Sequence, residues 1–221
     1  NYLRDEVHII RAATASCEQP EIIERECDDP LTTFEPVSID EVTAMIRKTP
    51  ARSCSLDPIP SWFVKKYPAI FAPVLCRLCN LSLATGTLPK TLKCAIVRPR
   101  LKKPGLDPDA PQSYRPISNL SYISKCVERI VCRRFISHAD KHSLLPVRQS
   151  AYRRFHSTET AVLSVLNDLV RAVDSGHVTL LVMLDLSAAF DTVDHEILLS
   201  VLQRRFSVTG GALDWFRSYL T

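Results

Sequence analysis

Apolar residues recur at spacings of three and four positions over most of the chain, which predicts a mainly helical protein. The clearest case is residues 38–48, where Ser38 and Glu41 form a capping-box pattern ahead of an apolar face. The same spacing predicts further helices near residues 61–67, 73–84, 119–140, 158–175, 195–206 and 211–220. Gly86 and Gly176 are the expected stop signals of two of these helices, and Asp194 is the expected cap of another.

The helix expected after Ser157 carries a strongly apolar face. Its predicted core positions are Val162, Val165, Leu166, Leu169 and Val173.

Two segments break the helical pattern and predict strands. Residues 91–105 suggest a short strand with basic flanks, and residues 178–184 form a continuous apolar run typical of a buried strand. Helices come first, and strands and helices alternate afterwards. The sequence therefore predicts a helix-rich α+β fold.

Charge divides the chain into two parts. With 221 residues, of which 46% are hydrophobic and 24% charged, the composition is that of a folded globular protein. The net charge of +4 hides an acidic start, because residues 1–45 hold three Arg against eleven Asp or Glu. We therefore expect residues 1–35 to be an acidic leader or linker, as a weak helix or unstructured chain, and residues 36–221 to be a basic domain that binds a polyanion.

The cysteine pattern and the absence of long apolar runs argue against several classes of protein. The eight cysteines are scattered, which favours reduced, mostly buried thiols over a disulfide framework. Cys76 and Cys79 fit one helix face, whereas Cys126 and Cys132, six residues apart, leave opposite sides of a helix and do not suit a zinc finger. No apolar run approaches the roughly 20 residues of a membrane span, and the first residues are neither a signal peptide nor a start methionine. We expect an excised piece of a larger protein with no membrane partner.

Two basic segments are candidates for phosphate contact. Six cations and no acid lie between residues 90 and 104, and the loop before residue 157 contains Arg148, Arg153 and Arg154. Unopposed cations beside a strand favour phosphate binding, and the alternative is a solvated charged face.

Asp185 is the candidate catalytic residue. It follows the apolar run 178–184 directly, and an ionised carboxylate beside a packed strand costs several kcal/mol unless it is paired or binds a metal. The alternative is an Asp that caps a helix or holds a turn.

Five motifs occur in an order and at spacings that resemble one family. They are LDPIP (56–60), KKPGLDP (102–108), YRPISNL (114–120), QSAYRRFHSTETA (149–161) and LDLSAAFDTVDH (184–195). The set is similar to the reverse transcriptases of non-long-terminal-repeat retrotransposons, the long interspersed elements and their jockey-like relatives, over about residues 35–221. The resemblance implies a right-hand polymerase represented by its fingers and part of its palm, with the thumb absent.

The resemblance also implies a function, an RNA-directed DNA polymerase that adds deoxynucleotides by two-metal phosphoryl transfer. Asp185 and the Leu186 carbonyl would bind Mg²⁺, two ions of which occupy the complete site. The family's other metal carboxylates belong to an aromatic-x-Asp-Asp motif, which these 221 residues do not contain. The chain by itself is therefore expected to be inactive.

Further site residues follow from the same resemblance. Phe190 would lie under the sugar of the incoming nucleotide and exclude a 2′-hydroxyl, although a packed core Phe is an alternative. The other expected nucleotide-binding residues are Ser187, Ala188, Ala189, Arg153 and Gln149. The expected nucleic-acid-binding residues are Lys93, Arg98, Arg100, Lys102, Lys103, Arg115, Arg148 and Arg154. For Arg115, a buried ion pair is an alternative role.

The implied partners are an RNA template, a DNA primer and deoxynucleoside triphosphates, in a ribonucleoprotein of the nucleus and cytoplasm. An unpaired edge of the strand 178–184 would also favour self-association. Two other hypotheses remain: a non-catalytic or domesticated remnant that binds nucleic acid or a partner, and a haloacid-dehalogenase-like phosphatase. Against the latter, Ser187 stands where that class needs a second Asp.

Overall fold

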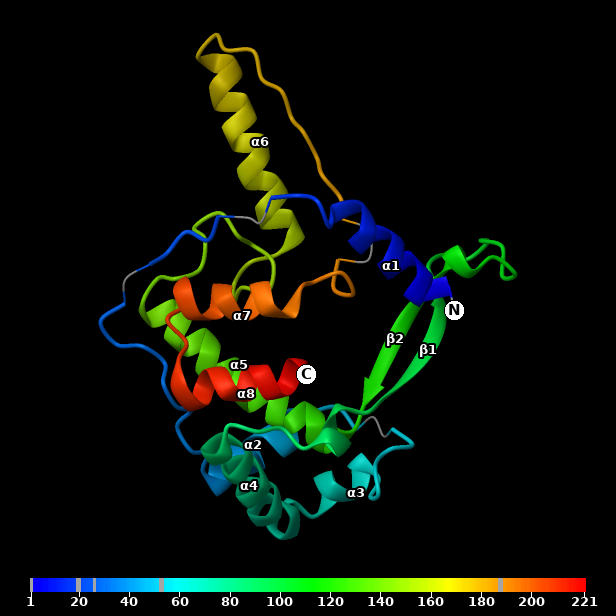
Figure 1. Cartoon of the computed structure of the whole chain (residues 1–221), viewed down its shortest axis with the longest axis vertical. Coiled ribbons are helices and arrows are strands. Elements are labelled where there is room, and N and C mark those ends of the chain that lie inside the picture. Colours follow the sequence, from blue (N-terminus) through cyan, green and yellow to red (C-terminus); the bar gives the residue numbers. More distant parts are fainter. Residues whose placement is uncertain (1, 19–20, 26, 52–53, 187–188) are drawn as a thin grey trace.

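The computed structural model describes the whole chain except residues 1, 19–20, 26, 52–53 and 187–188. Helices dominate the described part, and one β-hairpin projects beside them (Figure 1). The helices are α1 (Tyr2–Thr14), α2 (Ile39–Lys48), α3 (Ser61–Lys66), α4 (Pro68–Thr85), α5 (Tyr122–Lys141), α6 (Thr158–Asp174), α7 (His195–Arg204) and α8 (Gly210–Leu220). Short 3₁₀ turns cover Lys90–Lys93 and Pro111–Ser113. The strands are β1 (Ala95–Leu101) and β2 (Tyr114–Leu120), so a helix-rich α+β fold is present.

The core forms where α4 packs between α2 and α8. Trp215 of α8 is buried there, and its indole Nε1 donates a hydrogen bond to Ser82 Oγ of α4 at 3.0 Å. By length and composition alone, α4 could span a membrane. One of its faces, however, is buried in this core, and an apolar core helix has the same composition.

Helix ends follow the capping signals of the sequence. Ser38 Oγ accepts a hydrogen bond from the Glu41 amide at the start of α2, and Asp194 Oδ1 accepts two at the start of α7. Gly86 ends α4 with φ 62°, where an added Cβ would lie 3.0 Å from the Gly211 carbonyl oxygen. Glycine is therefore required at this position both by its backbone conformation and by the closeness of α8.

The acidic N-terminal part does not stay apart from the body. The Leu31 amide donates to the Ser207 carbonyl and the Thr209 amide donates to the Leu31 carbonyl, both at 2.9 Å. Phe34 is buried against Trp215 and Phe216, with ring centroids 6.1 and 5.9 Å away. Residues 31–37 are thus part of the packed structure, although their sequence has no periodicity that predicts it.

Two predicted boundaries were wrong. Residues 119 and 120 belong to β2, so α5 begins only after Ser121, whose hydroxyl caps it by accepting from the Ser124 amide. Helix α4 begins at Pro68 rather than residue 73, because a proline at the first helical position needs no amide hydrogen bond.

The prediction of a buried strand at residues 178–184 was also wrong. This segment is an extended, unpaired coil whose apolar side chains are at least half exposed. A strand requires a neighbour for its backbone groups, and none of the described residues pairs with this segment.

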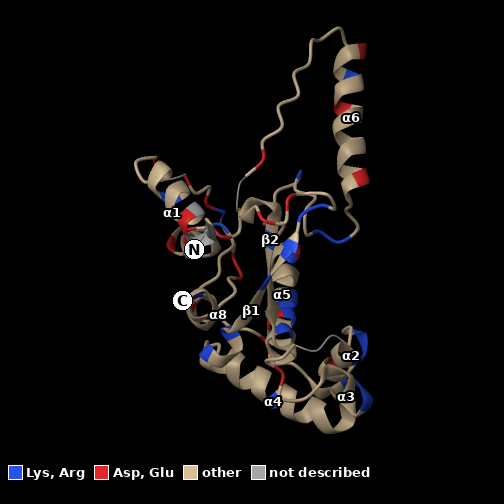
Figure 2. Ribbon diagram, turned by 90° about the vertical axis from the view of Figure 1, so that its right-hand side faces the viewer, with Lys and Arg blue, Asp and Glu red and all other residues tan. Residues whose placement is uncertain are grey.

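The prediction that one face of α6 is buried in the core was also wrong. Val162, Val165, Leu166 and Val173 are exposed and Leu169 is half-buried, because α6 stands away from the body (Figures 1 and 2). Ser157 nevertheless caps α6 in a capping box with Thr160, as the local sequence predicts.

The cysteines are free thiols, but the expectation that most of them are buried was wrong: only Cys76, Cys79 and Cys126 are buried. Burial raises the pKa of Cys79 to about 12 and that of Cys126 to about 11, which keeps both protonated at neutral pH. No three His, Cys, Asp or Glu side chains of the described residues are placed to hold a metal ion. Cys79 and Cys126 are therefore core residues with low reactivity.

Candidate functional site

Asp185, the expected catalytic carboxylate, lies exposed in the coil that follows α6. Leu186 beside it is also exposed. The expectation that a packed strand desolvates Asp185 was therefore wrong, for the reason given above for residues 178–184. Magnesium demands a near-octahedral set of oxygen ligands, and the described residues place no group of three or more His, Cys, Asp or Glu side chains around Asp185. These residues alone do not form a complete magnesium site.

The turn after Asp185 leads into α7. Ser187 and Ala188 lie outside the described residues, Ala189 is exposed, and the Phe190 ring is 80% exposed. The alternative of a packed core Phe is thus not realised. Hydrogen bonds from the amides of Ile197 and Glu196 hold the pKa of Asp194 below its usual range, which assigns this acid to helix capping.

In the loop between α5 and α6, two of the three arginines already have partners. Arg153 Nη1 donates to the carbonyl oxygens of Pro146 and Gln149 at 3.2 and 3.5 Å, and so braces the loop. Arg148 forms an ion pair with Asp168 of α6 at 2.6 Å. Arg154 instead lies 4.8 Å from the centre of the Phe155 ring. The Gln149 side chain donates to the Ala151 carbonyl within the same loop.

Two aromatic residues of this loop were missed by the sequence analysis. Tyr152 and Phe155 are exposed and have φ angles of 60° and 63°, a left-handed conformation that non-glycine residues rarely adopt. Such backbone strain is common where a loop serves binding. The signal in the sequence was their position beside Arg153 and Arg154.

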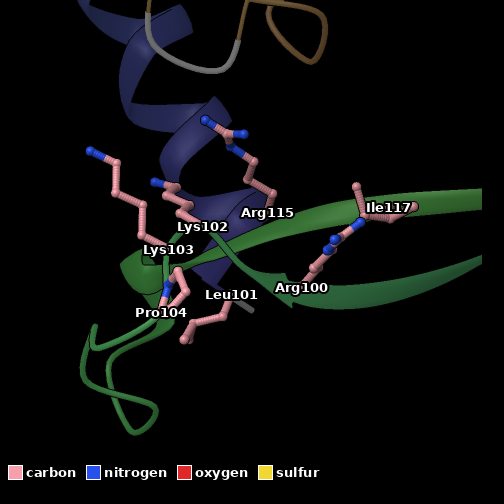
Figure 3. A pocket seen from close by; sticks show the side chains of 7 residues that line it. All are labelled: Arg100, Leu101, Lys102, Lys103, Pro104, Arg115 and Ile117. Atoms are coloured by element: carbon pink, nitrogen blue, oxygen red, sulfur yellow. The ribbon is translucent and has the colours of Figure 1, made fainter.

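The β-hairpin gathers the basic residues more closely than any other expected group. Arg100, Lys102, Lys103 and Arg115 line a pocket of about 610 Å³ together with Leu101, Pro104 and Ile117 (Figure 3). Arg100 lies directly opposite Arg115 in the antiparallel register, and the Lys102 amide donates to the Ser113 carbonyl at 2.8 Å. Strand alternation places Arg98, Arg100 and Lys102 on one face.

Like charges directly across a strand pair are unfavourable without a counterion, and no acid is among the described residues that line this pocket. Its physical chemistry is therefore that of an anion site. Because phosphate oxygens accept hydrogen bonds from both Arg and Lys, a nucleic-acid backbone or a triphosphate fits the pocket. Arg115 is exposed here, so the alternative of a buried ion pair is not realised.

Lys93 does not join the hairpin cluster. Its Nζ donates to the Ser218 carbonyl oxygen at 2.8 Å, in the last turn of α8. A cation at a helix C-terminus satisfies a free carbonyl and the helix dipole, so Lys93 has a structural role in this arrangement. Asp57 of the LDPIP motif is structural as well, because its carboxylate accepts from the amides of Cys54 and Tyr122 at 2.7 and 2.6 Å.

Comparison with known proteins identifies the family of this chain. Residues 101–220, from the end of β1 to the end of α8, match the family described as reverse transcriptase (RNA-dependent DNA polymerase). The chain is 30% identical over 174 residues to the probable RNA-directed DNA polymerase from transposon BS of Drosophila melanogaster, covering 78% of this chain and 19% of that protein. It is 30% identical to the X-element polymerase of the same species (76% and 18%) and 29% identical to that of mobile element jockey (77% and 19%).

The fold and the basic hairpin define a helix-rich α+β domain suited to binding polyanions. The chain belongs to the reverse transcriptase family, and its relatives identify it as reverse transcriptase sequence of the non-long-terminal-repeat retrotransposon type. It spans about a fifth of the length of the curated relatives it matches.

Proposed function

We propose that this chain is part of an RNA-directed DNA polymerase of a mobile element, which adds deoxynucleotides to a DNA primer along an RNA template. One observation carries the proposal: the match to the reverse transcriptase family covers residues 101–220, which include most of the basic pocket, Asp185 and α8. The named activity of the Drosophila relatives is RNA-directed DNA polymerisation, which supports the same reaction here.

In this proposal the hairpin belongs to the fingers, and residues 184–195 belong to the palm. Asp185 and the Leu186 carbonyl are ligands of a divalent metal, with Mg²⁺ as the physiological ion. Hard oxygen ligands are what Mg²⁺ prefers, and other carboxylates of the polymerase complete the site. Phe190 contacts the sugar of the incoming nucleotide, and its exposed ring leaves it free to do so.

The fingers loop and the hairpin bind the polyanions of the reaction, which are the template, the primer and the triphosphate. Arg153 and Gln149 contact the triphosphate after exchanging their present partners within the loop. We place the polymerase in a ribonucleoprotein of the nucleus and cytoplasm, without a membrane partner. Self-association through residues 178–184 remains a prediction, and it is supported by their exposed apolar side chains.

A second candidate function is nucleic-acid binding without catalysis. It is supported by one observation: the described residues form a basic pocket, and phosphate binding at this pocket needs no metal. Catalysis by a protein that contains this segment separates the two candidates.

A chimeric polymerase tests the proposal directly. We replace the aligned segment of the transposon BS polymerase with the matching residues of this chain, so that the relative supplies the rest of the enzyme. We expect extension of a DNA primer on an RNA template in Mg²⁺, and its complete loss in excess chelator because the reaction needs the metal. A folded chimera that binds RNA but extends no primer, beside an active parent polymerase, would favour the non-catalytic candidate.

Replacing Lys102 and Lys103 with Ala should weaken the binding of the 221-residue chain to single-stranded RNA of any sequence. Each phosphate contact releases counterions and contributes about 0.7 to the slope of log affinity against log salt, so the slope should fall by about 1.4. The measurement is fluorescence anisotropy with labelled RNA at several salt concentrations. The matched control is Arg133→Ala with Arg171→Ala, which removes two cations outside the pocket. Equal slopes for the parent and both variants would remove the pocket from the RNA interface.

A further inference from the structure

A second basic surface lies at the end of the molecule formed by α2, α3 and α4, away from the hairpin pocket (Figure 2). Between residues 42 and 106 the sequence contains a single acid, Asp57. The Asp57 carboxylate is held by the amides of Cys54 and Tyr122. The two acids of α2, Asp40 and Glu41, lie in its first turn, whereas its cations Arg47 and Lys48 lie in its last turn, within this stretch.

Three aromatic rings are exposed along α3 and at its end. Trp62 is 56% exposed, and Phe63 and Tyr67 are each more than a third exposed. Trp62 and Phe63 meet edge to face with centroids 5.5 Å apart, and Phe63 and Tyr67 are tilted at 4.9 Å. Phe63 also contacts the half-buried Phe71 of α4 at 6.0 Å, which anchors the group to the body. The rings thus hold one another in place while part of each remains open to solvent.

Cations border these rings on the same side of the fold. Lys66 Nζ lies 5.5 Å from the centre of the Tyr67 ring. Lys65 Nζ donates to the Thr49 carbonyl at 2.6 Å, which joins α3 to the end of α2, and Arg47 and Lys48 are exposed in the last turn of α2. Figure 2 shows the Lys and Arg segments of α2 and α3 on one edge of the molecule.

We propose that Trp62, Phe63 and Tyr67, with Arg47, Lys48 and Lys66, form a stacking platform for single-stranded nucleic acid. Bases of any sequence stack on exposed aromatic rings, and neighbouring cations neutralise the phosphates between them. The proposal rests on the proposed function in one respect, because the template of a reverse transcriptase is single-stranded before it is copied. It names a contact on α2 and α3 that is separate from the pocket of the β-hairpin.

Charge favours nucleic acid over the other occupants of an exposed aromatic surface. A second copy of this chain that docked through the same surface would bring its own cations against the cations of α2 and α3. Only a docking mode that presents its acidic residues instead would avoid this repulsion. An anionic lipid surface satisfies the cations as well, but it would also use the exposed apolar stripe of α4, which includes Ile70, Val74 and Leu81. A single strand of nucleic acid needs only the rings, for base stacking, and the cations, for its phosphates, and it leaves that stripe unused.

The chain has a built-in reporter, because it contains only two tryptophans. Trp215 is 2% exposed, bonded to Ser82 and stacked on Tyr219 at 5.4 Å, so RNA does not reach it. We expect single-stranded RNA to quench the emission of Trp62 in the 221-residue chain. Trp62→Phe should remove the quenching but keep affinity within about twofold of the parent, since a ring remains. Trp62→Ala should weaken binding about tenfold or more.

Ile70→Ala serves as the matched control, because it trims a similarly exposed side chain on α4 that is outside the platform. It should leave RNA affinity unchanged. Unquenched emission at saturating RNA, together with parental affinity of Trp62→Ala, would overturn the platform. If Lys102→Ala with Lys103→Ala still weakens binding in that case, the proposed function survives. If the parent chain binds no RNA at all, both fail.

Two further measurements exclude the other occupants. The first is Trp62 emission in the presence of phosphatidylserine vesicles. A blue shift with the vesicles, without quenching by RNA, would assign the surface to a membrane and overturn the proposal. Sedimentation showing a dimer that Trp62→Ala dissociates, with unchanged RNA affinity, would assign it to a second copy and overturn it equally.

Discussion

Asp185→Asn is expected to reduce primer extension by the chimeric polymerase about a thousandfold or more. A metal ligand stabilises the charge that develops on the transferred phosphoryl group, a contribution of several kcal/mol, and a neutral amide replaces a carboxylate poorly as a magnesium ligand. The measurement is the single-turnover rate of nucleotide addition at saturating triphosphate. RNA affinity should stay unchanged, because Asp185 does not line the basic pocket.

The control for this change is Asp174→Asn, which neutralises the last residue of α6 and should leave the rate unaltered. A rate for Asp185→Asn within tenfold of the parent would contradict the metal assignment. Asp185 would then hold a turn, which is the alternative that its sequence leaves open.

The sequence predicts local structure well in this chain, because local interactions carry it. Ser38 and Asp194 begin helices through hydrogen bonds to amides two or three residues away. Gly86 ends a helix through its own φ angle. Each of these signals lies within one helical turn of the feature that it predicts, so no knowledge of the rest of the fold is needed.

Burial was less predictable, because it depends on partners distant in sequence. The apolar faces of α6 and of residues 178–184 show which side chains are suited to burial, but the pattern does not name the surface that buries them. Conversely, Leu31 pairs with Val208 and Phe34 packs on Trp215, although their own segment has neither helical nor strand periodicity. Contacts over such separations leave no local signal.

The same difference between local and distant contacts applies to the candidate site. The sequence identified the cations of the hairpin, and the antiparallel register brings Arg100 opposite Arg115. It did not show that the Lys93 ammonium is bonded to the end of α8, nor that Arg148 pairs with Asp168. A count of basic residues overstates the free positive charge wherever tertiary contacts have already supplied an acceptor.

The contact of Phe34 with the core also decides how far the acidic N-terminal part is separable from the domain. Its surface ion pairs, Glu24 with Arg204 and Asp29 with Lys141, join exposed side chains, and because solvent screens such pairs they contribute little to stability. The burial of one large ring contributes more. Phe34 is 5% exposed and fills the space beside Trp215 and Phe216.

Phe34→Ala should therefore lower the free energy of unfolding by about 3–5 kcal/mol, through lost apolar burial and the cavity left between α8 and the N-terminal segment. Urea unfolding followed by fluorescence measures the change in a Trp62→Phe background, where the remaining Trp215 forms one wall of that cavity. Ile23→Ala, in an exposed position of the same segment, should change stability by less than about 0.5 kcal/mol. A loss below about 1 kcal/mol for Phe34→Ala would show that the residues before Val37 form a detachable leader. A loss in the expected range would show that the domain requires them, because the ring completes the core that holds α8 against α4.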